Sequence, residues 1–314
     1  MCKMKSAIIL KDRIFIPDYD GHSDMLKELG IEDTEKNAAM LFVRAELSPK
    51  NGDVFTPIDE WIFEVDQDIK PDWFVESYEK ERMIQAVKEW AKNRIHIGID
   101  GLEINSGANH YIKDCKNVEI YGSASISRVY GSATISYVYG SASISRVYGS
   151  ASISYVYGNA SISDVYGSAS ISYVYGSASI SDVYGSATIS RVYDSASISY
   201  VYGNASISYV YDSATISRVY DSASISYVYG SASISDVYDS ATISYVYGSA
   251  SISEVKGKAV VANSPYSKWQ KQSDLILSEN ATFKDNIGKV IYQSGDYKLV
   301  SVNGGTALKA RAEQ

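Results

Sequence analysis

Fifteen consecutive nine-residue repeats fill residues 121–255, and they constrain the fold more than any other feature of the sequence. Each repeat reads Tyr, Gly or Asp, Ser or Asn, Ala, Ser or Thr, Ile, Ser, a variable residue and Val. A short, fixed, uninterrupted period is typical of a solenoid, in which each repeat packs on its neighbours. The repeats therefore predict a stacked architecture.

The residue pattern inside a repeat predicts a strand with one buried face. Ala at position 4 and Ile at position 6 alternate with hydroxyl residues at positions 3, 5 and 7. Val at position 9 comes three residues after Ile, so the alternation slips, and we expect a corner or bulge near positions 7 and 8. The Gly, Asp, Ser and Asn residues at positions 2 and 3 predict a second corner.

Position 8 adds a second period to the first. It is charged in most odd-numbered repeats and Tyr in most even-numbered repeats, with Arg191 and Tyr200 as the two exceptions. We therefore expect coils of about 18 residues, two repeats per coil, with opposite edges that stack charges and tyrosines. The charged edge comprises Arg128, Arg146, Asp164, Asp182, Arg218 and Asp236, and the tyrosine edge comprises Tyr137, Tyr155, Tyr173, Tyr209, Tyr227 and Tyr245. At about 4.8 Å per coil, the rod would be about 35 Å long.

The flanking segments predict a domain on each side of the repeats. Residues 1–94 hold three of the four Trp and carry strand and helix patterns, with the clearest helix at 72–92, so we expect a small N-terminal α+β domain. Residues 95–261 form the solenoid, with irregular first coils at 95–120. Residues 262–314 form a C-terminal β cap, with a closing coil at 280–285 and a hairpin of 290–293 with 297–302. The predicted fold class is thus mainly β, a parallel β-solenoid.

Composition and cysteine usage favour a reducing compartment. The two cysteines, Cys2 and Cys115, are far apart in sequence and do not suggest a disulfide framework. The sequence shows neither a signal peptide nor a transmembrane run. We therefore expect a cytoplasmic protein that does not bind membranes, with association with a virion as the alternative.

Few residues in the sequence suggest catalysis or metal binding. The segment 14–21 resembles the first motif of haloacid-dehalogenase-type phosphatases, which implies Asp18 as a nucleophile and Asp20 as an acid/base. The expected Thr is His22 here, and residues 1–94 are short for that fold. The histidines His22, His96 and His110 show no metal-ligand spacing. We therefore predict no enzyme, no cofactor and no metal site.

The tyrosine edge is the strongest indication of function. Tyrosine supplies rigid, amphipathic contact area and is enriched at binding surfaces. Stacked tyrosines also stabilise neighbouring coils, and the two roles are compatible. The repeats carry a net charge of −4 without clustered cations, so we expect no nucleic-acid binding.

Three resemblances follow from these motifs. The repeats, with flanking segments 15–18, 65–68 and 86–91, resemble uncharacterised nonapeptide-repeat β-solenoid proteins of gut bacteria and phages, a group that implies no particular activity. The Tyr-Gly-Ser step is similar to the repeats of ice-nucleation proteins, although Thr is sparse and the period is nine. The eight carboxylates of the repeats resemble, at lower density, the acidic faces of DNA-mimicking pentapeptide-repeat solenoids.

The sequence therefore predicts a non-enzymatic structural or interaction protein. The solenoid would be a rigid spacer or a binding surface rich in Tyr and Ser. Its expected partner is another protein or a second copy, including a homodimer formed through a tyrosine ladder. The alternatives are an ice- or water-ordering surface, a DNA-mimic inhibitor, and an enzyme confined to the N-terminal domain around Asp18 and Asp20.

Overall fold

The structure is a computed structural model that describes residues 5–263, 275–285, 290–293, 297–302 and 305–310. The chain divides into two compact units. The first comprises Met1–Ile97 with Ala108–Tyr111, and the second comprises Gly98–Gly107 with Ile112–Gln314. Each unit has its own hydrophobic core.

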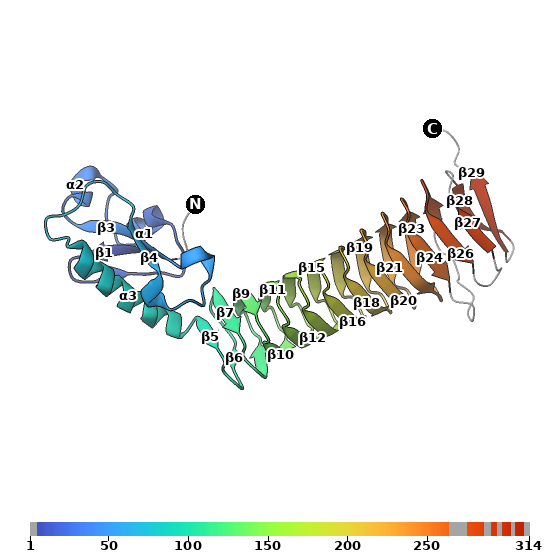
Figure 1. Cartoon of the computed structure of the whole chain (residues 1–314), viewed down its shortest axis with the longest axis horizontal. Helices are drawn as coiled ribbons and strands as arrows, with labels where there is room; N and C mark the ends of the chain where they lie inside the picture. Colours follow the sequence, from blue (N-terminus) through green and yellow to red (C-terminus); the bar gives the residue numbers. More distant parts are fainter. Residues whose placement is uncertain (1–4, 264–274, 286–289, 294–296, 303–304, 311–314) are drawn as a thin grey trace. The chain divides into compact units, whose positions relative to one another are not determined.

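The first unit is built on a four-stranded antiparallel sheet, as the α+β prediction requires (Figure 1). Its strand order is β2-β1-β3-β4, from β1 (Lys5–Leu10), β2 (Ile14–Phe15), β3 (Phe42–Ser48) and β4 (Ile62–Val65). The helical segments are α1 (His22–Glu28), α2 (Glu35–Ala38), the 3-10 turns η1 (Lys50–Gly52) and η2 (Ile58–Glu60), and α3 (Glu76–Lys92). The apolar side of α3, with Met83 and Val87 fully buried, packs against the core around Trp61.

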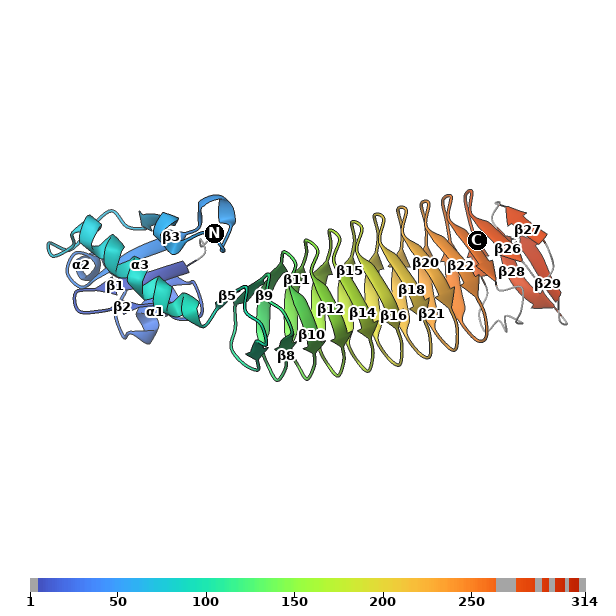
Figure 2. The same cartoon turned by 60° about the horizontal axis from the view of Figure 1, so that its bottom comes forward.

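The second unit is a parallel β-solenoid with 18 residues per coil, which confirms the period inferred from position 8 (Figure 2). Each coil contributes one strand to each of two sheets. The even sheet contains β6 (Glu103–Ile104), β8 (Val118–Ile120), β10 (Thr134–Val138), β12 (Ser152–Val156), β14 (Ser170–Val174), β16 (Thr188–Val192), β18 (Ser206–Val210), β20 (Ser224–Val228), β22 (Thr242–Val246), β24 (Val260–Asn263) and β26 (Thr282–Asp285).

β5 (Ile95–Ile97) belongs to the first unit. The odd sheet of the second unit runs through the remaining strands of the rod. They are β7 (His110–Lys113), β9 (Ser125–Tyr130), β11 (Ser143–Val147), β13 (Ser161–Val165), β15 (Ser179–Val183), β17 (Ser197–Val201), β19 (Thr215–Val219), β21 (Ser233–Val237), β23 (Ser251–Val255) and β25 (Leu275–Leu277). Irregular coils before residue 121 thus precede the regular repeats, as predicted.

Within a repeat, positions 5–9 form the strand and positions 1–4 form the turn. In β16, Ile189 and Val192 are buried at 1% and 0% exposure, whereas Ser190 and Arg191 between them both face outward. The strand register pairs positions 5, 6, 8 and 9 of successive coils and skips position 7. The predicted slip therefore lies inside the strand, and the turn at positions 1–4 is the only corner of a repeat.

The turns require residues that tolerate positive φ. Position 2 has φ between 55° and 75°, whether it is Gly or Asp. At Asp194, Asp221 and Asp239 the carboxylate accepts a hydrogen bond from a backbone amide of the preceding coil; the Gly203 amide, for example, donates to Asp221 Oδ2 at 3.1 Å. The backbone adds a ladder of its own, since the Ser141 amide donates to the Gly122 carbonyl at 2.9 Å. Position 2 thus faces outward, as the Asp residues predicted.

The closing coil is confirmed, and the predicted terminal hairpin is wrong. Phe283 in β26 pairs with Val261 and is buried in the position that Ile holds in the repeats. β27 (Val290–Gln293) does not pair with β28 (Tyr297–Val302): it pairs antiparallel with β26, and β28 pairs with β25 and β29 (Gly305–Ala310). The two sheets each end in an open edge, so each needs its own antiparallel strand. Residues 264–274, which include Pro265 and Trp269, lie outside the described residues.

No helix in the described part of the chain is long and apolar enough to cross a membrane.

Candidate functional site

The two sheets present chemically different outer faces. Position 8 of every even-numbered repeat lies on the even sheet, and position 8 of every odd-numbered repeat lies on the odd sheet. We call these surfaces, formed by positions 5, 7 and 8, the tyrosine face (strands β10 to β22 of the even sheet) and the charged face (strands β9 to β23 of the odd sheet). The structure thus places the predicted tyrosine set and the predicted charged set on opposite faces of the rod, on strands and not at corners.

The tyrosine face carries one charge over seven strands. Its position-8 residues are Tyr137, Tyr155, Tyr173, Arg191, Tyr209, Tyr227 and Tyr245, and positions 5 and 7 hold Ser or Thr. Rings in adjacent coils stack, with centroids 5.3 Å apart for Tyr137 and Tyr155 and 5.1 Å apart for Tyr227 and Tyr245. The exposure of Tyr137, Tyr209 and Tyr245 reaches 36–38%.

A second tyrosine ladder runs beside the first. The position-1 residues that follow the even strands stack without interruption from Tyr121 to Tyr247, with centroid separations of 4.9–5.2 Å. Tyr157 of this ladder meets Tyr137 of the tyrosine face edge-on, with centroids 6.5 Å apart. The sequence contained a signal for this doubling, because positions 8 and 1 lie either side of the inward Val and so project to the same side.

The stacking determines what the tyrosine face can recognise. Interplanar angles within its ladder are 10–14°, so each ring turns its faces toward the rings above and below. The ring edges and the hydroxyl groups are left to face outward. Such a surface favours packing and hydrogen bonding against another flat surface. It does not favour insertion of a base or a sugar between rings, because that would break the ladder.

Arg191 occupies the centre of the tyrosine face. It is the fourth of the seven position-8 residues, and it pairs in register with Tyr173 on one side and Tyr209 on the other. Its guanidinium carbon lies 5.0 Å and 5.9 Å from the centroids of these rings, within range of cation–π attraction. Its Nη1 also donates to the Tyr173 hydroxyl at 2.6 Å. The ladder therefore holds the arginine in place.

The charged face carries seven charges over eight strands. Two ion pairs link successive coils, Arg146 with Asp164 at 3.6 Å and Arg218 with Asp236 at 3.7 Å. Both involve side chains that are substantially exposed, so each contributes little to stability. Asp164 and Asp182 face each other in register, and burial together with the Asp164 carboxylate raises the pKa of Asp182. The charges of the charged face are therefore only partly paired with opposite charges.

The position-1 tyrosines on the side of the charged face form another ladder. It runs from Tyr130 to Tyr238, with centroids 4.7–5.4 Å apart. Partial burial, followed by the Asp182 carboxylate, raises the pKa of Tyr202 to about 12. The Tyr202 hydroxyl therefore stays protonated near neutral pH and can donate a hydrogen bond.

Asp18 and Asp20, the carboxylates of the phosphatase-like motif, both lie in ion pairs. The Arg94 Nη2 donates to both Asp18 oxygens at 3.0 Å, and Lys5 Nζ lies 3.3 Å from Asp20 Oδ1. Lys5 is 2% exposed, and burial lowers its pKa, opposed by the Asp20 charge. A nucleophilic carboxylate needs a free oxygen that faces a substrate. The pairing of both groups favours a structural role.

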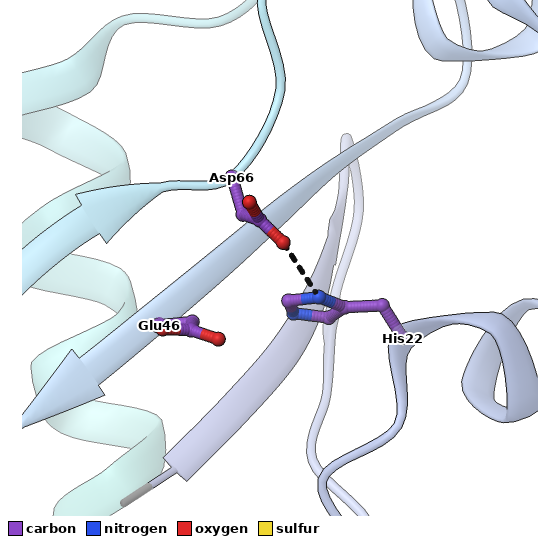
Figure 3. Close-up of side chains that lie close together, drawn as sticks. All are labelled: His22, Glu46 and Asp66. Atoms are coloured by element: carbon purple, nitrogen blue, oxygen red, sulfur yellow. Dashed lines mark ion pairs between the residues drawn. The ribbon is translucent and has the colours of Figure 1, made fainter. Parts of the chain in front are cut away.

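The same unit brings together His22, Glu46 and Asp66, which the sequence analysis did not group. One ligand atom from each lies within 4.8 Å of the others (Figure 3). His22 begins α1, Glu46 lies in β3 and Asp66 follows β4. Their positions in the sequence, 20 or more residues apart, match no metal motif. Only the antiparallel pairing of β3 and β4 and the packing of α1 on the sheet bring them together.

His96 and His110 form a second buried pair. His96 Nε2 and His110 Nδ1 are 3.1 Å apart, and the rings stack with centroids 5.4 Å apart. Burial, with smaller contributions from His110 and Arg94, lowers the pKa of His96 to about 4. His96 is therefore neutral at physiological pH.

No protein-family model matches the sequence, and the searches for similar curated proteins and for similar solved structures found no match. The geometry of the two faces and of the N-terminal clusters therefore carries the functional argument.

Proposed function

We propose that this chain is a non-enzymatic structural or interaction protein whose solenoid is a rigid scaffold and whose tyrosine face binds a second copy of the chain. The observation that carries the proposal is the contrast between the faces. The tyrosine face has one charge in seven strands and the charged face has seven in eight. Interface centres are depleted in charged residues and enriched in Tyr and Arg.

The size of the tyrosine face suits a modest homodimer. Seven strands at about 4.8 Å spacing and five residues at about 3.3 Å give a surface of roughly 35 by 16 Å. Two such faces would bury roughly 1,100 Å², near the lower end of specific interfaces. The neutral, hydroxyl-bearing surface has no charge pattern that would repel a second copy, apart from Arg191. We therefore expect a weak dimer, with a dissociation constant of roughly micromolar order.

Arg191 gives this interface its register. A twofold dimer that centres on Arg191 would oppose two arginines, which repel each other. A shift by one coil brings each Arg191 against a tyrosine of the partner and creates two symmetric Arg–Tyr contacts. One charged residue in a uniform surface thus disfavours the centred alignment and leaves the shifted ones, in the way that a buried polar residue restricts register in a coiled coil.

The experiment uses two deletions that keep the nine-residue phase. Deletion of residues 193–210 removes two repeats and leaves every downstream strand on its own sheet. Deletion of residues 193–201 removes one repeat and moves every downstream strand to the other sheet. The core positions Ala, Ile and Val are the same in both halves of a coil, so both deletions preserve the packing. The one-repeat deletion, however, places Arg218, Asp236 and Glu254 on the tyrosine face.

Analytical ultracentrifugation over a concentration series gives the readout. We expect the full chain and the two-repeat deletion to dimerise with similar dissociation constants, and the one-repeat deletion to remain monomeric. A full chain that stays monomeric at millimolar concentration would overturn the proposal, and so would identical association of the two deletions.

Point variants give an independent check. Tyr155→Asp together with Tyr227→Asp places two charges on the tyrosine face, and Tyr200→Asp places one on the charged face. Position 8 already accommodates Tyr, Arg, Asp and Glu in the same register, so none of these changes should alter the fold. We expect only the double variant to abolish dimers. Loss of dimers in Tyr200→Asp instead would assign the interface to the other face.

A further inference from the structure

The triad of His22, Glu46 and Asp66 has the form of a divalent metal site. His22 is 8% exposed, so its ring is fixed by the fold and not by solvent. Its Nε2 lies 3.3 Å from the Ala45 carbonyl oxygen, and its Nδ1 lies 3.3 Å from Asp66 Oδ2. Figure 3 shows Asp66 and Glu46 directed toward the imidazole from the neighbouring strand segments.

The contact of His22 Nε2 with the Ala45 carbonyl favours one tautomer of the imidazole. A carbonyl oxygen only accepts, so in the neutral tautomer in which Nε2 donates to it, Nδ1 holds a lone pair. That lone pair points at the Asp66 carboxylate, which also only accepts. Two acceptors at 3.3 Å need a cation between them, either a proton on Nδ1 or a metal ion. In a metal-binding histidine, the ring nitrogen that does not bind the metal commonly donates a hydrogen bond to a group such as a backbone carbonyl.

The carboxylates around the triad favour a bound cation. No hydrogen bond or ion pair links the Glu46 carboxylate to another residue within the described part of the chain. Glu46 also lies directly opposite Glu64 across the β3–β4 ladder, where like charges destabilise pairing. On its other side it faces Ser6, whose hydroxyl is fully buried and unpartnered.

The distances fit a zinc-sized ion. Zinc binds histidine nitrogen and carboxylate oxygen at about 2.0–2.2 Å, which separates two ligand atoms in a tetrahedron by about 3.4 Å. His22 Nδ1 and Asp66 Oδ2 are already 3.3 Å apart. One Glu46 carboxylate oxygen lies within 4.8 Å of a ligand atom of each of the other two residues, so a change of its side-chain rotamer would be needed to form the third bond.

We propose that His22 Nδ1, Glu46 and Asp66 bind one divalent transition-metal ion of the zinc class. Imidazole with carboxylates selects such ions over Mg²⁺ and Ca²⁺, which prefer oxygen ligands alone. Asp66 is 64% exposed, so the fourth coordination position faces solvent. The ion would connect the start of α1 to β3 and to the end of β4. This site is independent of the solenoid and of its proposed dimerisation.

The test is calorimetric titration of the full chain, without a histidine tag and after treatment with EDTA, with zinc chloride and with magnesium chloride. We expect one zinc ion per chain and no magnesium binding. Thermal unfolding of the first unit, followed by tryptophan fluorescence in a Trp269→Phe background, should shift upward with roughly 100 µM zinc, because a ligand specific to the folded state stabilises it.

Isosteric variants identify the ligands. Asp66→Asn and Glu46→Gln should each weaken zinc binding at least tenfold, whereas Asp72→Asn, an exposed carboxylate outside the triad, should leave binding unchanged. Because Asp66 is exposed, its variant should fold even if Glu46→Gln does not. His96→Gln tests the other histidine cluster. The proposal fails if the full chain binds no zinc at that concentration, if Asp66→Asn binds it normally, or if His96→Gln alone removes binding.

Discussion

Replacement of one isoleucine in the middle of the rod measures how the solenoid is stabilised. Ile189 is 1% exposed and stacks in register between Ile171 and Ile207. Ile189→Ala removes three carbons, which costs about 2.5 kcal/mol in transfer free energy at about 0.8 kcal/mol each. A residual cavity adds about 1 kcal/mol, because the backbone cannot close over it. The Thr188 amide bonds one neighbouring coil, and the Ala187 carbonyl bonds the other.

We therefore expect Ile189→Ala to lower the free energy of unfolding of the solenoid by about 3 to 4 kcal/mol. The assay is urea unfolding followed by far-UV circular dichroism. In a Trp269→Phe background, fluorescence of Trp61, Trp73 and Trp90, all in the first unit, gives an internal reference that should not move. Ile189→Val should cost about 1 kcal/mol and Ser190→Ala, on the surface, less than about 0.5 kcal/mol. The reasoning is refuted if Ile189→Ala costs less than about 1 kcal/mol, or if the tryptophan transition shifts equally.

Three further predictions concern the turns and the titratable groups. Gly176→Ala should destabilise the solenoid by about 1 kcal/mol, because φ is 67° at this position and the added Cβ would lie 3.2 Å from the Gly158 amide nitrogen. Gly176→Asp should be nearly neutral, because Asp194 occupies the equivalent position one coil later and its carboxylate accepts a hydrogen bond from the preceding coil. Thermal unfolding of the two variants compares these effects. The lowered pKa of His96 means that the unfolded state binds more protons below pH 6.5, so stability of the first unit should be complete above that value and fall as pH drops toward 4. The full pKa shift of His96 corresponds to about 3 kcal/mol of unfolding free energy, and screening by solvent reduces the expected loss of stability to roughly 1 to 2 kcal/mol. Urea titrations at several pH values measure this loss, and the His96→Gln variant should not show it. The raised pKa of Tyr202 means that this hydroxyl ionises first in the unfolded state, so stability should fall as pH rises from 10 toward 12. The ultraviolet titration of Tyr202, obtained as the difference between the full chain and Tyr202→Phe, should lie above that of free tyrosine, and a difference titration centred near pH 10 would contradict this.

The sequence was sufficient for the solenoid because its constraints are local and repeated. Ala, Ile and Val at fixed positions define the buried stack, and the parity of position 8 defines the coil length. The pairing of β27 and β28 could not be predicted in the same way. Their apolar patterns fit a hairpin, but which strand each one meets depends on two open sheet edges that exist only after the rod has formed.

The site residues also differ in whether a local sequence pattern could predict them. The two ladders on the even side follow from the spacing of positions 8 and 1, and so were within reach of the sequence. The approach of His22, Glu46 and Asp66 depends on strand register and on the packing of α1, which no local pattern encodes. In the phosphatase-like motif, by contrast, a local pattern is present but its surroundings in the fold do not leave both carboxylates free. Its carboxylates are present, but Arg94, 76 residues from Asp18, occupies one of them.

The difference between the two faces argues for a contact surface and not only for stability. The even and odd strands have the same length, the same inward residues and the same register. Any stabilisation that stacked tyrosines give one sheet is equally available to the other. Position 8 nevertheless holds tyrosine at six of seven sites on one face and at one of eight on the other. Folding alone gives no reason for this asymmetry, whereas a rod that meets its partner on one side needs the two faces to differ.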